Sequence, residues 1–149
     1  MSVLLEQVRL ELTGQRASPL YLQGLAQCIA IYLDSTADDI VRRNALPAYQ
    51  LRRVLSAMEA HLAEEFHLGQ LAEIAGMSEY HFSRLFKKAA GYSPSQFFIR
   101  LRMARARQLL VETERSVIDV GLEVGYSSPS HFSQVFKREV GVTPTQYRK

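Results

Sequence analysis

HFSRLFKKAAGYSPSQF, residues 81–97, is the stretch that decides the fold, because it returns fifty positions later as HFSQVFKREVGVTPTQY, residues 131–147. The offset is constant over all seventeen positions, and His, Phe, Ser, Phe, Lys, Gly, Pro and Gln are identical in place. An internal repeat of this kind indicates one structural unit that the chain builds twice.

The similarity continues upstream of each copy with a register shift of one residue. AGMS, residues 75–78, matches VGYS, residues 124–127, and Ser128 is the additional residue of the second copy. Turns and loops tolerate a one-residue insertion better than packed helices do. We therefore expect a tight turn at the glycine of each copy.

Apolar residues flank each turn at the i, i+3, i+4 spacing of an amphipathic helix. These positions are Leu68, Leu71, Ala72, Ala75, Phe82, Leu85 and Phe86 in the first copy, and Val117, Val120, Gly121, Val124, Phe132, Val135 and Phe136 in the second. Each copy ends at a glycine, Gly91 or Gly141, which is the residue favoured just past a helix C-terminus. The spacing predicts a helix-turn-helix over about residues 68–90 and another over about residues 117–140.

Capping signals mark where the helices begin. SPSQ, residues 93–96, and TPTQ, residues 143–146, have the pattern of capping boxes, in which a hydroxyl and a Gln side chain satisfy backbone donors reciprocally. Serines 78, 116 and 128 stand at the other expected helix starts. These signals complete the boundaries of both units.

The first capping box opens a helix over about residues 94–111 that connects the two units. At 1.5 Å per residue this helix is about 27 Å long. We expect it to pack through Phe97, Leu101 and Ala104. Apolar positions between Leu51 and Leu62 predict a further amphipathic helix before the first unit, and no stretch alternates as a strand does. The expected fold class is all-α, with two helix-turn-helix subdomains joined by a long linker helix.

Residues 1–46 are expected to form a short N-terminal helical segment ahead of a domain over residues 47–149. Apolar spacing predicts one helix that ends at Gly14 and another that starts at Ser18-Pro19, followed by a polar linker over residues 35–45. The segment has a net charge of −1, whereas residues 47–149 carry 14 basic and 10 acidic side chains, a net of +4. Two roles for the segment stay open: dimerisation, or packing of its apolar faces within the chain.

Composition limits the class of protein. The chain has 149 residues, of which 47% are apolar and 22% charged, as in a folded domain. The single cysteine, Cys28, cannot form an intrachain disulfide, which favours a reducing compartment and a buried structural thiol. The start lacks the pattern of a signal peptide, and no apolar run approaches the roughly 20 residues of a membrane span. We expect a cytoplasmic protein with no membrane contact.

The sequence shows no constellation for catalysis or for metal binding. It has no paired carboxylate site, glycine-rich phosphate loop, nucleophile–base arrangement or metal-ligand cluster. His61 and His67 lie six apart without a cysteine or carboxylate in ligand register, so we interpret both as surface residues. The chain is predicted not to be an enzyme and to need no cofactor.

Basic residues cluster in the middle of the repeat region. Residues 80–111 contain seven basic side chains and no acidic one. Such a block attracts phosphate, and a helix-turn-helix presents its second helix to a major groove while backbone contacts fix its register. For a single arginine the competing interpretation is a solvated helix face. The candidate phosphate contacts are His81, Lys87, Lys88, Arg100, Arg102, Arg105, Arg107, Lys137 and Arg138.

These motifs resemble the DNA-binding region of the AraC/XylS family of bacterial transcription regulators. The resemblance covers about residues 48–149 and rests on LAEIAGMS (71–78), YHFSRLFK (80–87), VGYSSPSHFS (124–133) and GVTP (141–144). It implies transcription regulation through sequence-specific binding to a duplex DNA operator. Longer members place a β-rich effector-binding domain before this region, ending in helices that dimerise. Residues 1–46 resemble only such a helical tail, which makes a homodimer through them an open expectation.

The family's base-reading positions fall on Tyr80, Ser83 and Arg84 in the first copy. Arg84 suits a bidentate contact to guanine, with a salt bridge to a neighbouring acid as the alternative. Tyr80 suits a contact to sugar or to a thymine methyl group, with packing at the helix edge as the alternative.

The matching positions in the second copy are Ser130, His131, Ser133 and Gln134. Gln134 stands where the family often has Arg, so adenine is its natural bidentate partner. For His131, as for its equivalent in the first copy, a phosphate contact or a local helix contact is favoured over base readout. If both copies read DNA, one chain spans successive major grooves about 34 Å apart. The alternative is that only the first copy reads DNA and the second, with Gln134 and Glu139, contacts RNA polymerase.

Overall fold

A computed structural model describes residues 46–149 of the chain. Its helices are α4 (Ala48–Ala60), α5 (Leu68–Ile74), α6 (Glu79–Ala90), α7 (Pro94–Glu112), α8 (Val117–Glu123), α9 (Pro129–Val140) and α10 (Pro144–Arg148). This part of the chain contains no strand, which confirms the all-α prediction for it. The two expected N-terminal helices, the polar linker and Cys28 lie outside the described residues.

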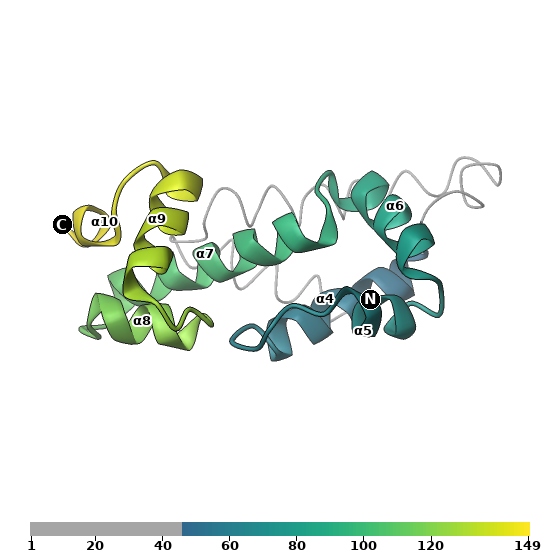
Figure 1. Cartoon of the computed structure of the whole chain (residues 1–149), viewed down its shortest axis with the longest axis horizontal. Coiled ribbons are helices and arrows are strands. Elements are labelled where there is room, and N and C mark those ends of the chain that lie inside the picture. Colours follow the sequence, from purple (N-terminus) through teal and green to yellow (C-terminus); the bar gives the residue numbers. More distant parts are fainter. Residues whose placement is uncertain (1–45) are drawn as a thin grey trace.

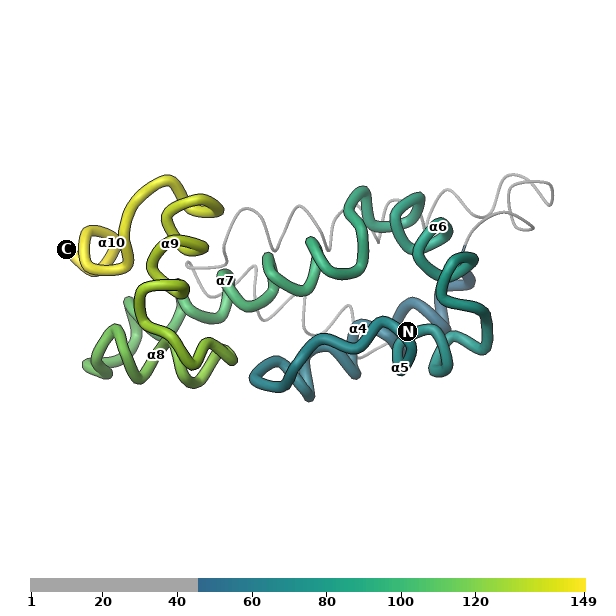
Figure 2. Tube along the Cα trace, viewed as in Figure 1, coloured from purple at the N-terminus to yellow at the C-terminus, as the bar shows by residue number. Residues whose placement is uncertain are grey.

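Helix α7 forms the long axis of the described part, and a group of helices lies at each of its ends (Figure 1). Helices α4, α5 and α6 gather at its N-terminal end, and α8, α9 and α10 at its C-terminal end. The tube view shows the same division, with α6 and α9 near opposite ends of α7 (Figure 2). The linker helix thus separates two helix-turn-helix units, α5–α6 and α8–α9.

Hydroxyl caps begin the helices where the sequence predicts. Ser78 Oγ accepts the backbone N–H of His81 at 3.3 Å, and Ser128 Oγ accepts that of His131 at the same distance. Ser116 caps α8, and reciprocal capping boxes open α7 and α10. Each cap stabilises its helix by about 1 kcal/mol, so the helix starts are fixed locally.

Each unit has a core built on a pair of phenylalanines from the repeat. Phe82 and Phe86 are fully buried in the first unit, and Phe132 and Phe136 are fully buried in the second. Their ring centroids lie 5.5 Å apart in the first pair and 5.8 Å apart in the second. The repeated residues therefore fill equivalent places in two separate cores.

Helix α7 contributes to both cores with different residues. Phe97, Phe98 and Leu101 belong to the first core. The buried residues that follow on α7 belong to the second core: Met103, Ala106, Leu109 and Leu110. The expectation that Ala104 packs α7 is wrong, because Ala104 is only half-buried. Since α7 meets the two units on different faces, no single apolar stripe marks its buried side.

A second correction concerns the helix that precedes the first unit. The pattern predicts that this helix reaches Leu62, but α4 ends at Ala60. Leu62 follows in a turn and packs partly against the first core. An apolar residue in the right register after a helix end contributes to the periodicity without being helical.

Candidate nucleic-acid interface

Burial of one face of α6 fixes which residues point outward. Phe82, Leu85 and Phe86 lie in the core, so the opposite side of the helix faces solvent. Tyr80 is 80% exposed, which rules out packing at the helix edge. Ser83, one turn further along, is half-buried.

Arg84 is the exposed cation at the centre of this outward face. It forms no hydrogen bond or ion pair with any residue that the structure describes, so the alternative of a salt bridge does not arise there. Lys87 and Lys88 are exposed in the last turn of the same helix, where the dipole favours positive charge. The outward side of α6 is therefore cationic from Arg84 to Lys88, after the exposed Glu79 in its first turn.

Helix α9 presents the matching positions with different chemistry. Ser130, His131 and Gln134 are exposed and Ser133 is half-buried. The His131 ring packs edge-on against Tyr126, with 5.4 Å between ring centroids. This is the local contact that the sequence left open for the second histidine. His81 is also exposed, and its backbone N–H binds the Ser78 hydroxyl.

The cations at the end of α9 are partly neutralised. Arg138 Nε lies 3.0 Å from Glu139 Oε1, whereas Lys137 is exposed with no ion partner among the described residues. Arg138 is exposed and Glu139 is partly buried, and a pair at the surface contributes little to stability. It does lower the net positive charge of this face relative to α6.

The arginines of α7, all expected at phosphate, have intramolecular contacts. Arg100 lies over the Tyr92 ring at 4.0 Å, and Arg107 Nε donates to the Tyr147 hydroxyl at 2.9 Å. Arg102 Nε donates to the Leu62 carbonyl at 2.8 Å, and its Nη2 donates to the Glu64 carbonyl. Because Nε and Nη2 of the half-buried Arg102 both donate to carbonyls, this side chain has fewer donors left for a phosphate.

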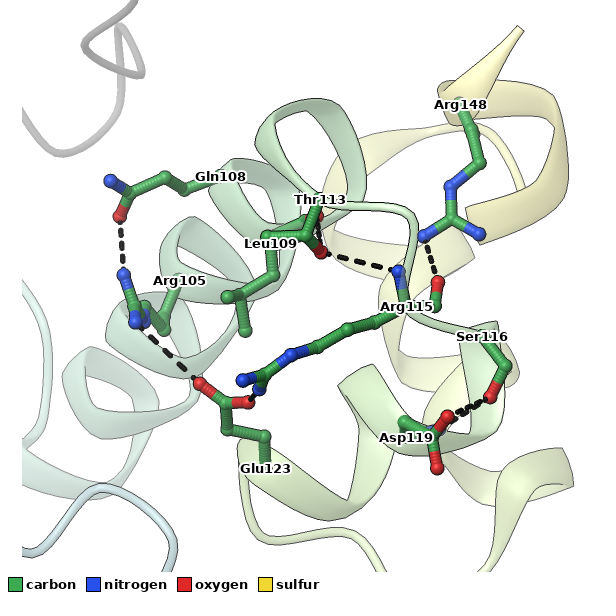
Figure 3. Close-up of polar contacts among 9 residues, drawn as sticks. All are labelled: Arg105, Gln108, Leu109, Thr113, Arg115, Ser116, Asp119, Glu123 and Arg148. Carbon is green, nitrogen blue, oxygen red and sulfur yellow. Dashed lines mark hydrogen bonds and ion pairs between the residues drawn. The ribbon is translucent and has the colours of Figure 1, made fainter.

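Figure 3 shows how further arginines are held within the second unit. Arg105 donates to Gln108 at 2.9 Å and lies 3.5 Å from Glu123, which also pairs with Arg115. Arg148 donates from Nε to the Leu110 carbonyl at 3.2 Å and from Nη2 to the Arg115 carbonyl. These arginines join α7, α8 and α10 into one unit.

Two exposed cations were missed by the sequence analysis. Arg52 and Arg53 lie on the solvent side of α4, between the buried Leu51 and Val54. Neither forms an ion pair with a described residue. The adjacent basic pair within an amphipathic pattern was the signal that could have found them.

Few of the remaining titratable groups within residues 46–149 have notable surroundings. Burial raises the pKa of Tyr126 above its ordinary value of 10.0, and the neighbouring Arg102 guanidinium opposes that rise. His61 and His67 are exposed, and His61 contacts Glu64 at 2.9 Å. Within residues 46–149 there is no cluster of potential metal ligands. None of the described helices is long and apolar enough to cross a membrane.

Known proteins similar to this chain are transcriptional regulators. The family model described as a helix-turn-helix domain matches residues 71–149. An uncharacterized HTH-type transcriptional regulator from Haemophilus influenzae is 35% identical over 112 residues, which cover 72% of this chain and 38% of that protein. The regulator GbdR from Pseudomonas aeruginosa is 39% identical over 79 residues, or 53% of this chain and 22% of GbdR. The chain thus matches about two fifths or less of the length of these relatives.

Solved structures similar to this chain are also domains of transcriptional regulators. A transcriptional regulator from Chromobacterium violaceum, described by its AraC-type DNA-binding domain, superposes with a TM-score of 0.63 at 37% identity, covering 66% of this chain and 88% of that one. The DNA-binding domain of AdpA, solved in complex with a target DNA, has a TM-score of 0.61 at 35% identity and the same coverage. Both likenesses cover the two helix-turn-helix units and the helix between them.

Proposed function

The chain belongs to the AraC-type family of helix-turn-helix transcriptional regulators, and on this premise we propose that it binds a duplex DNA operator through both of its units. The family and the relatives are regulators rather than enzymes, in agreement with the prediction that the chain performs no chemistry. The AdpA domain, which has the same fold, was solved with a target DNA. The observation that carries the proposal is Arg84 on the outward face of α6, which is exposed and has no hydrogen bond or ion pair with a described residue.

In this proposal α6 is the first recognition helix. Arg84 has its full fork of donors available for the O6 and N7 atoms of a guanine, a contact worth about 1–3 kcal/mol of discrimination. Tyr80 lies one turn earlier and reaches sugar or a thymine methyl group, with Ser83 between them. The cap at Ser78 holds the start of the helix in a fixed direction.

Helix α9 is the second recognition helix and reads a different base. Gln134 stands at the position of Arg84 and matches the N6 and N7 atoms of adenine. Ser130 and Ser133 add hydroxyl groups, and His131 approaches the backbone beside them. Helix α7 has 19 residues, about 28 Å at 1.5 Å per residue, which suits successive major grooves about 34 Å apart.

Phosphate contacts follow from which cations are available. Lys87, Lys88 and Lys137 are exposed and have no ion partner among the described residues, so we place them at phosphate together with His81. Contacts from Arg100, Arg105, Arg107 and Arg138 compete with the intramolecular partners of these side chains. We therefore expect the lysines to account for most of the salt dependence.

One observation favours a second function for the α8–α9 unit. Ile118 and Leu122 lie one turn apart on α8 and are 54% and 53% exposed. An exposed apolar pair suits a protein partner such as RNA polymerase more than it suits DNA. In that case only α6 reads DNA, and Gln134→Ala leaves the affinity for DNA unchanged. A homodimer through residues 1–46 and a cytoplasmic location also stay proposals.

The proposal is tested by selecting bound duplexes from a random library. The affinity for an enriched duplex is then compared with that for random duplex of equal length at the same salt concentration. We expect the enriched duplex to bind at least about 1,000-fold more tightly, the lower range for specific recognition. Equal affinities for the two duplexes contradict the proposed function.

A further inference from the structure

Arg102 stands at the point of α7 where the two cores meet. Its neighbour Leu101 lies in the first core and its neighbour Met103 in the second. The guanidinium of Arg102 binds the Leu62 and Glu64 carbonyls, 40 and 38 residues away in the connection between α4 and α5. A side chain on the linker helix is thus attached to the backbone segment that leads from α4 into the first unit.

The same guanidinium also contacts both units through aromatic rings. It lies 4.5 Å from the ring centroid of Phe98, in the first core, and 5.3 Å from that of Tyr126, in the second core. Tyr126 belongs to the turn between α8 and α9. Cation–π contacts of this kind hold a planar guanidinium in place while its donors remain directed at the carbonyls.

The turn of the second unit comes very close to this contact. A Cβ atom added to Gly125 would lie 2.6 Å from Arg102 Nη2 and 2.8 Å from the Ala63 carbonyl oxygen. The corresponding glycine of the first unit, Gly76, has nothing within 4 Å of such an atom. Both glycines have positive φ, 68° at Gly76 and 89° at Gly125, so the turn geometry alone does not explain the difference. The close approach is particular to the place where the second unit meets the first.

We propose that Arg102 is a positioning residue that locks the second helix-turn-helix unit against the first and so sets the separation and orientation of α6 and α9. In its DNA consequences the inference rests on the proposed function. A stiff connection raises the effective concentration of the second recognition helix at its own box once the first box is bound. A looser connection lowers the affinity for two boxes and leaves the affinity for one box unchanged.

The chain offers a matched control for Arg102. Arg148 also donates from Nε and Nη2 to two backbone carbonyls, those of Leu110 and Arg115. These carbonyls belong to the end of α7 and to the segment before α8, so the contact stays within the second unit. Arg148→Ala removes the same pair of guanidinium–carbonyl hydrogen bonds as Arg102→Ala without releasing one unit from the other.

The first experiment measures the geometry of the DNA-free chain. Nitroxide labels are placed on cysteines introduced at Glu73 of α5 and Leu122 of α8, both exposed, in a chain in which Cys28 is replaced by serine. Pulsed electron paramagnetic resonance then gives the distance distribution between the units. We expect Arg102→Ala to broaden this distribution and Arg148→Ala to leave it unchanged. An unchanged distribution in folded Arg102→Ala overturns the inference.

The glycines supply a second pair of variants if Arg102→Ala fails to fold. Gly125→Ala and Gly76→Ala both place a side chain at positive φ, but only the first meets Arg102 and Ala63. We expect Gly125→Ala to shift or broaden the distance distribution and Gly76→Ala to preserve it. Equal distributions in the two variants overturn the inference.

The second experiment uses the enriched duplex in three forms: intact, with one box removed, and with one or two base pairs inserted between the boxes. Arg102→Ala is expected to bind the intact duplex about tenfold more weakly and the one-box duplex within about twofold of wild type. It should also lose less affinity on insertion than wild type does. An equal loss on one-box and two-box duplexes makes Arg102 a phosphate contact and overturns the inference. If wild-type chain prefers no duplex, the proposed function fails, and the distance measurement still decides the role of Arg102.

Discussion

The two helix-turn-helix units have equivalent cores and different surfaces. Phe82 of the first unit and Phe132 of the second are both fully buried, and a serine hydroxyl caps each recognition helix. On the outward face the first unit presents Arg84, a cation with no ion partner within residues 46–149, where the second presents Gln134. The phenylalanines and capping serines that the fold needs recur in both units, whereas the residue at the outward position of Arg84 changes.

The difference in charge extends to the helix ends. Lys87 and Lys88 of α6 are exposed without an ion partner among the described residues, whereas Arg138 of α9 is paired with Glu139. The surfaces also differ at the turns, since the second turn contacts the first unit through Arg102. Under the proposed function we expect the first unit to supply most of the DNA affinity and the second to refine the choice of site.

The largest effect on stability is expected when a buried phenylalanine of either core is truncated. Phe82→Ala and Phe132→Ala should each reduce the free energy of unfolding by about 3–5 kcal/mol, because each removes a fully buried ring and leaves a cavity. Chemical unfolding followed by circular dichroism measures the loss, with the exposed Tyr80→Ala as a control below about 0.5 kcal/mol. A loss below about 1 kcal/mol in either phenylalanine variant breaks the equivalence of the two cores.

The next effect concerns base recognition. Arg84→Ala should cost about 1–3 kcal/mol of binding free energy on the enriched duplex and relax the preference at one base pair. Gln134→Ala should cost less, because its contact lacks a charge. Arg84→Lys is the control, since it keeps the charge and loses the bidentate geometry.

Competition binding with single-base variants of the duplex measures both outcomes. If Arg84→Ala loses equally on enriched and random duplex, Arg84 is a phosphate contact. A larger loss of affinity for Gln134→Ala than for Arg84→Ala would contradict the expectation that the first unit contributes more to DNA binding than the second.

The smallest effect is on the salt dependence. Lys87→Ala should weaken binding to all sequences alike and reduce the slope of log K against log salt concentration by about 1, because one phosphate contact is lost. Arg138→Ala should change the slope less, since Arg138 is already paired with Glu139. Titrations at several salt concentrations measure the slopes. Equal changes of slope in the two variants would contradict the expectation that the two units differ in the charge available to DNA.

The sequence predicted the helices well because their determinants are local. Apolar spacing and caps placed the linker helix at about 94–111, and the structure has it at Pro94–Glu112. The outward position of Arg84 also followed from local pattern, since three buried residues on α6 leave one side of the helix free. These features depend on residues a few positions apart.

The roles of the α7 residues depend on contacts that no local pattern encodes. Arg102 belongs to a basic run in the sequence, but its partners are carbonyls about 40 residues away. Ala104, which was expected to pack α7, is only half-buried, and α7 meets the two units on two different faces. The buried residues of a helix that packs into two cores can be assigned only when both cores are known.

The central claim is that one chain reads two successive major grooves, and a footprint of the enriched duplex tests it most directly. Hydroxyl-radical cleavage combined with a determination of the number of bound chains gives both quantities on the same complex. We expect one chain and two protected boxes on one face of the duplex, about one helical turn apart. A single protected box, or a repeated half-site that carries two chains, contradicts it.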